Sequence, residues 1–136
     1  IIEFSILFII LNYLEIASKK LEELSEIEFL AEKNESLKKD ITNYLIEGND
    51  KEAINKKINI NYKKILSEIN GNSNIQIIIK NKNDEAVANL LDELLKDHKK
   101  QFNLRKIESL EQKLINNLDE NSYSEFIKLK SQINRE

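Results

Sequence analysis

The chain has 136 residues, of which 33% are charged and 40% hydrophobic, and its formal net charge is −3. This length suits one domain, or a small bundle with an appendage, and the acidic balance gives no general attraction to nucleic acid. Cysteine is absent, which excludes disulfides and thiolate metal sites. Proline is also absent and glycine occurs only twice, so the sequence predicts an all-α fold. Because methionine is missing too, we expect the chain to be a piece of a longer protein.

The first predicted element is a helix that begins at Phe4 and reaches Leu14. Its apolar residues keep helical spacing, and further apolar residues fill its flanks, which predicts a buried, central helix. Residues 1–11 resemble a signal sequence or a membrane span in composition. However, Glu3 interrupts them, and they fall well short of the roughly 20 apolar residues that a span needs. We therefore expect no membrane association and a cytoplasmic protein.

Four shorter helices are predicted to cover this first helix. The third helix of the chain should end at Gly48, which suits the left-handed conformation of a helix stop. Either Asn49 or Asp50 should then cap the fourth helix, and Gly71 follows the fifth. The apolar residues that define helices two to five are Ile16, Leu21 and Leu24; Leu30, Leu37, Ile41, Tyr44 and Leu45; Ala53, Ile54 and Ile58; and Tyr62, Ile65, Leu66 and Ile69.

Residues 75–79 form the one strand-like stretch, IQIII, which is short and β-branched. A lone strand would have no partner in this sequence. We therefore predict an extended or one-turn connector at this point.

A long helix is predicted from about Asp84 to Leu118, and its apolar face changes side halfway along. At roughly 100° per residue, the apolar residues of its two halves lie on opposite sides, so the helix should serve two cores. We predict a dumbbell, in which a helical bundle (residues 1–80) is joined through a connector and half-helix (81–102) to a helical hairpin (103–136). The apolar face of the first half consists of Val87, Leu90, Leu91, Leu94, Leu95, His98 and Phe102. That of the second half consists of Ile107, Leu110, Leu114 and Leu118.

In the predicted hairpin, Asp119 or Asn121 caps a second helix that runs to about Arg135. Its Phe126, Leu129 and Ile133 should face Ile107, Leu110 and Leu114. Four apolar residues are left over. They either widen this seam or form a docking patch for a partner, and we favour the patch because so short a hairpin has little core of its own. The four residues are Leu104 and Ile115, roughly 80° from the seam, and the i,i+4 pair Tyr123 and Ile127.

The sequence shows no constellation that performs chemistry. His98 is the only histidine, and a bundle metal site would need a carboxylate three positions earlier, where Leu95 stands. We expect a half-buried or boundary histidine there. Gly48 and Gly71 are isolated, so no loop cradles phosphate, and no nucleophile stands near a base. We therefore predict no catalytic, cofactor-binding or metal-binding residues.

From Asn89 onward, the run NLLDELLKDHKKQFNLRKIESLEQKLINNLDENSYSEFIKLKSQINRE resembles the C-terminal end of bacterial DnaG-type primases. FSILFIILNY, which begins at Phe4, resembles the first helix of the same domain, although Tyr13 and Leu14 stand where the family has His-Pro. The resemblance lies in the order of elements and covers nearly the whole chain. It implies a non-catalytic domain whose hairpin docks on the N-terminal domains of the replicative DNA helicase, with the primase catalytic domain upstream.

The resemblance also implies a second partner. In this family the bundle can receive the acidic tail of single-stranded-DNA-binding protein, and basic pairs in the bundle are candidates for that contact, although such pairs are most often solubilising charge. They are Lys38 and Lys39, Lys56 and Lys57, and Lys63 and Lys64. We expect little or no direct binding of nucleic acid. Two alternatives stay open: a regulatory helical module of the helicase itself, and a self-associating helical scaffold.

Overall fold

The computed structural model describes residues 2–116 and 120–135, with side chains described for residues 2–115 and 124–133. Every regular element in these ranges is an α-helix, which confirms the all-α prediction. The contacts divide the chain into two compact units, Ile1–Lys96 and Asp97–Glu136. The predicted boundaries at residues 80 and 102, and the dumbbell arrangement, remain predictions.

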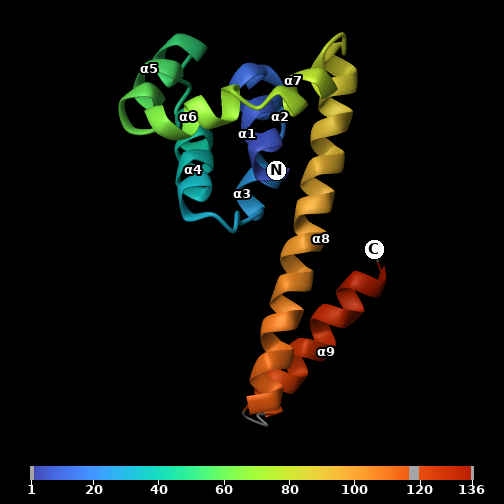
Figure 1. Cartoon of the computed structure of the whole chain (residues 1–136). Coiled ribbons are helices and arrows are strands. Elements are labelled where there is room, and N and C mark those ends of the chain that lie inside the picture. The colour runs from blue at the N-terminus through green and yellow to red at the C-terminus, as the bar shows by residue number, and fades with distance from the viewer. Residues whose placement is uncertain (1, 117–119, 136) are drawn as a thin grey trace. The chain divides into compact units, whose positions relative to one another are not determined.

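In the first unit, α1 lies among the other helices (Figure 1), and six of its eleven residues are buried. Ile6, Leu7 and Ile10 are fully inaccessible to solvent, as expected of a helix without a polar face. This confirms the prediction of a buried first helix. The helices of this unit are α1 (Ile2–Asn12), α2 (Leu14–Lys19), α3 (Leu21–Glu26), α4 (Glu32–Ile46), α5 (Lys51–Asn61), α6 (Lys63–Asn70), α7 (Ser73–Ile79) and the first part of α8 (Asp84–Asn116).

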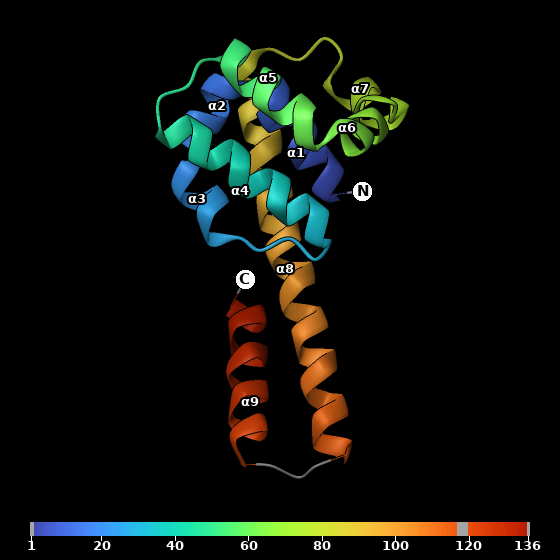
Figure 2. The same ribbon diagram turned by 90° about the vertical axis from the view of Figure 1, so that its left-hand side faces the viewer.

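The long helix α8 contributes to two different cores, as its apolar pattern predicts. Val87, Leu91 and Leu95 are buried in the core of the first unit, together with α1. Ile107 and Leu110 are also buried but lie outside that cluster, in the second unit. There α9 (Glu120–Arg135) turns back alongside the second part of α8 (Figure 2). Leu118 and Asp119 lie outside the described residues, and Asn121 lies within the first turn of α9 rather than before it.

The predicted stop and cap after α4 are confirmed. Gly48 has a φ of 84°, a left-handed conformation that glycine adopts without steric cost. The Asp50 carboxylate accepts a hydrogen bond of 2.9 Å from the Ala53 backbone N–H and so caps α5. Asn49 instead donates its side-chain amide to the Tyr44 carbonyl oxygen, at 3.1 Å.

Two predictions about the smaller elements were wrong, and the structure decides the conformation of residues 75–79, which the sequence left open. The second predicted helix is two helices, α2 and α3, because the backbone leaves the helical region at Lys20 (φ −116°, ψ 20°). Leu30 lies before α4 rather than in it, and its side chain is 44% exposed. Residues 75–79 belong to the helix α7, whose Ile75 and Ile79 are buried in the core on one helical face. The i,i+4 burial of these two residues outweighs their β-branched character.

The N-terminus of α4 is capped from another helix. No side chain of the preceding segment caps it, but the Glu3 carboxylate of α1 accepts hydrogen bonds from the backbone N–H of Leu30 (2.7 Å) and of Ala31 (3.3 Å). It also accepts one from the Asn34 side-chain amide, at 3.0 Å. A carboxylate at this position compensates the positive end of the helix dipole. Glu3 therefore fixes α1 to the start of α4.

Candidate functional site

The hairpin of the second unit carries the apolar residues predicted to dock on a partner. Leu104 is 44% exposed and Ile115 is 77% exposed, both on α8, while Ile127 on α9 is 45% exposed. The side chain of the fourth predicted residue, Tyr123, lies outside the described residues. Leu104, Ile115 and Ile127 are called the apolar flank below.

The seam between α8 and α9 is made by other residues. Ile107 and Leu110 are buried, and the remaining seam residues predicted from the sequence are half-buried: Leu114, Phe126, Leu129 and Ile133. By helical geometry, Leu104 and Ile115 project roughly at a right angle to this seam, and the antiparallel course of α9 brings Ile127 out on the same side. The three residues of the apolar flank thus project to one side of the hairpin, and the exposed Glu108 and Glu111 of α8 lie on that side between Leu104 and Ile115.

One residue of the predicted basic pairs is not on the surface. Lys38 is 2% exposed, and its ammonium group donates a hydrogen bond to the Ile27 carbonyl oxygen. It pairs with the Glu35 carboxylate at 2.6 Å and lies 5.3 Å from the centre of the Phe29 ring. Since these contacts use the charge inside the bundle, Lys38 cannot receive an acidic tail, and the prediction for this residue was wrong.

The other five lysines of the basic pairs are exposed. The Lys57 ammonium group lies 4.9 Å from the centre of the Tyr44 ring and donates to the Asn49 side-chain oxygen at 3.2 Å. The remaining four, Lys39, Lys56, Lys63 and Lys64, stand on α4, α5 and α6. Their exposure permits an acidic partner but does not select one.

His98 is more deeply buried than predicted. It is 3% exposed, and its ring stacks on that of Phe102 with centroids 6.5 Å apart and an angle of 25° between the ring planes. In the described part of the chain, no group of three or more His, Cys, Asp or Glu residues could hold a metal ion.

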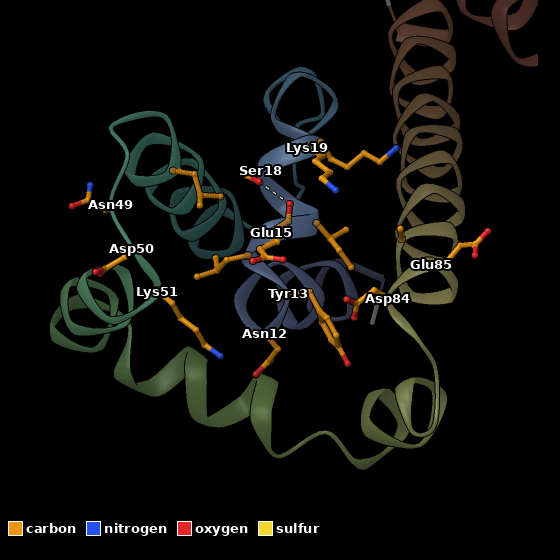
Figure 3. Close-up of a pocket in the computed structure, with 15 residues that line it drawn as sticks. Asn12, Tyr13, Glu15, Ser18, Lys19, Asn49, Asp50, Lys51, Asp84 and Glu85 are labelled. Atoms are coloured by element: carbon orange, nitrogen blue, oxygen red, sulfur yellow. Dashed lines mark hydrogen bonds between the residues drawn. The ribbon is translucent and has the colours of Figure 1, made fainter.

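The first unit contains a groove that was not predicted from the sequence. It has a volume of about 700 Å³ and lies among α2, the α4–α5 connection and the start of α8. Figure 3 shows Lys51 on one side of it and Asp84 and Glu85 on the other. Because three distant segments of the chain form this groove, no local sequence signal could have predicted it.

The charges of the groove nearly balance. Four carboxylates (Glu15, Asp50, Asp84 and Glu85) and three ammonium groups (Lys19, Lys20 and Lys51) line it. Asp50 is engaged as the cap of α5, and Lys20 forms an ion pair of 2.9 Å with Asp92. The hydrogen bond and the charge of Asp92 raise the pKa of Lys20. Among its described lining residues there is no histidine or cysteine, so the groove presents no nucleophile paired with a base.

No family model, curated protein or solved structure matches the chain. The primase resemblance therefore remains a proposal based on the order of elements. Across residues 2–116 and 120–135, no helix combines the length and the apolar character that crossing a membrane requires.

Proposed function

We propose that this chain is a non-catalytic helicase-interaction domain of a bacterial replicative primase. Its hairpin would bind the N-terminal domains of the replicative DNA helicase, and primer synthesis itself would belong to another domain of the primase, in the cytoplasm. Such a tether holds the polymerase at the fork and raises its effective local concentration. It thereby modulates primer synthesis and unwinding.

The observation that carries the proposal is the exposure of the apolar flank. Ile115 exposes 77% of its surface, and Leu104 and Ile127 expose nearly half of theirs, on a hairpin of about 30 residues. So small a unit has little core of its own, since chains below about 40 residues usually need staples or partners. A partner that covers this side would bury apolar area that the hairpin alone leaves in water.

The decisive experiment changes the apolar flank and measures helicase binding by calorimetry. Truncating buried interface residues to alanine typically costs about 1–4 kcal/mol each. We therefore expect the variant with Leu104→Ala, Ile115→Ala and Ile127→Ala to bind the helicase N-terminal domain at least about tenfold more weakly, which is about 1.4 kcal/mol. Circular dichroism should show unchanged helicity, because the three side chains lie outside the seam.

Exposed isoleucines of the first unit provide the matched control. Ile46, Ile60 and Ile77 are 63%, 76% and 69% exposed, so their change to alanine removes comparable surface. The control should bind within about twofold of the original chain, a difference well below 1 kcal/mol. Equal losses in both variants would contradict a contact through the hairpin. No binding by the original chain, with concentration-dependent dimerisation instead, would favour a self-associating scaffold.

A second contact is proposed for the first unit. Its exposed lysines, Lys39, Lys56, Lys57, Lys63 and Lys64, offer charges for the acidic tail of single-stranded-DNA-binding protein. This contact rests on the family resemblance, to which the exposure of these lysines adds only accessibility.

A further inference from the structure

Three lysines form a line along the part of α8 that belongs to the second unit. Lys99, Lys106 and Lys113 are seven residues apart, and all three are exposed. Seven residues are nearly two helical turns, so the three side chains project within roughly 40° of one another and lie roughly 10 Å apart along the axis. We call this line the lysine stripe.

The acidic residues of this part of α8 lie on the other side of the helix. Asp97, Glu108 and Glu111 project roughly 140–180° away from Lys106. Among the described side chains, none of the three lysines forms an ion pair. The stripe is therefore a local excess of positive charge in a chain whose net charge is −3. Lys100 and Arg105, beside it on α8, raise the local potential further.

We propose that the lysine stripe binds the phosphodiester backbone of nucleic acid, without sequence preference. Lysine binds phosphate as a point charge, and neutralisation of phosphates by such cations supplies the sequence-independent part of nucleic-acid affinity. This departs from the expectation that the net charge suggests, because binding depends on where the cations lie and not on their sum.

The surroundings of the stripe favour nucleic acid over an acidic protein. The residues that dominate protein interfaces are typically aromatic or otherwise well buried on binding, and the exposed apolar residues of α8, Leu104 and Ile115, project to the opposite side from the stripe. Backbone contacts to nucleic acid need no such anchor.

The aromatic ring nearest to the stripe is not available for stacking on bases. Phe102 is half-buried, with the Lys106 ammonium group 5.5 Å from its ring centre and the His98 ring stacked beside it. Phe102 therefore adds no stacking to the phosphate contacts of the stripe, since stacking needs an open ring face.

The test is fluorescence anisotropy with the full chain and labelled DNA of about 20 nucleotides, longer than the roughly 20 Å stripe. A duplex and a single strand are measured separately between about 50 and 200 mM salt. Three neutralised phosphates predict slopes of log K against log salt of about −2.7 for the duplex and about −2.1 for the single strand. The duplex affinity should then fall about fortyfold over this range.

The variant with Lys99→Glu, Lys106→Glu and Lys113→Glu should bind either DNA at least about tenfold more weakly at the lower salt concentration. Its control, Lys33→Glu, Lys80→Glu and Lys82→Glu, makes the same change in net charge at exposed lysines of the first unit. The DNA affinity of this control should fall by less than about threefold. Circular dichroism verifies that both variants are folded, and the shorter pair Lys99→Gln with Lys106→Gln replaces the triple change if it unfolds.

The proposal would be overturned if the two triple variants lost equal DNA affinity. It would also be overturned if the original chain showed no salt-dependent binding of DNA. Displacement of the DNA by polyglutamate of equal charge as readily as by unlabelled DNA would overturn it too, because the stripe would then serve an acidic polypeptide. Helicase binding through the apolar flank is a separate measurement, so the two proposals can fail independently.

Discussion

Among the Lys, Arg, Asp and Glu side chains that the structure describes, Lys38 is the most deeply buried, with 2% of its surface exposed. The sequence predicts a surface position for Lys38, as one member of a basic pair. In the structure, its ammonium group instead contacts the Glu35 carboxylate, the Ile27 carbonyl oxygen and the Phe29 ring. A buried charge is tolerated only when partners replace the lost water. Lys38 thus connects α4 to the segment that precedes it.

Replacing Lys38 by methionine should lower the free energy of unfolding by about 3 kcal/mol, because the Glu35 carboxylate and the Ile27 carbonyl would lose their cation. Adding Glu35→Met should recover part of this loss. Lys39→Met is the matched control, since Lys39 is the exposed neighbour on the same helix. Urea unfolding followed by circular dichroism measures all four proteins. A loss no larger than that of the control would show that the enclosed charge contributes little.

Tyr62, between α5 and α6, makes the stability of the folded chain depend on pH. Its hydroxyl donates a hydrogen bond of 2.5 Å to the Asp40 carboxylate of α4. Burial first, and then this hydrogen bond and the charge of Asp40, raise the pKa of Tyr62 above its ordinary value of 10.0. The folded state therefore keeps the proton at a pH where the unfolded chain loses it.

The contribution of Tyr62 should be complete below pH 10 and should decrease as the pH rises above that value. Tyr62→Phe should cost about 1 kcal/mol at neutral pH through the lost hydrogen bond. It should also lose less stability than the original chain on going to alkaline pH, and Tyr13→Phe serves as the control. Parallel stability curves for the Tyr62→Phe variant and the original chain above pH 10 would contradict this account.

Among the elements, α1 and α4 are joined by the Glu3 carboxylate. Glu3→Ala should lower the free energy of unfolding by about 1–2 kcal/mol, because it removes a helix cap and leaves N–H groups without an acceptor. Glu22→Ala, on an exposed position of α3, should change stability by less than about 0.5 kcal/mol. Denaturant unfolding of both variants provides the comparison. If the two changes are equal, solvent replaces the Glu3 contacts at no cost.

In the whole molecule, α8 belongs to two units, and the extensive core found among the described side chains lies in the first unit. A chain truncated before Asn103 should therefore keep its helical bundle, with a cooperative thermal transition largely retained. Calorimetry and near-ultraviolet circular dichroism are the measurements. An unfolded product would mean that the hairpin is part of the main core and that the two-module description is wrong.

Features that depend on neighbouring residues could be predicted from the sequence. Helical periodicity predicted the buried α1 and the change of side of the apolar face in α8, and local chemistry predicted the stop at Gly48 and a cap at Asn49 or Asp50. These signals lie within one or two helical turns, where spacing and capping act directly. Leu104, Ile115 and Ile127 are exposed, and the sequence predicts that they lie outside the seam between the two hairpin helices.

Features that depend on contacts with other segments of the chain could not be predicted and required the folded structure. Glu3 accepts hydrogen bonds from residues 27 to 31 positions away, and Lys38 is buried by a segment that itself has no regular structure. The β-branched residues of α7 are helical because Ile75 and Ile79 enter a core built by other helices. In α7, burial in this core outweighs a local β preference of about 1 kcal/mol or less. In all three cases, the periodicity of the sequence contains no information about the contacts.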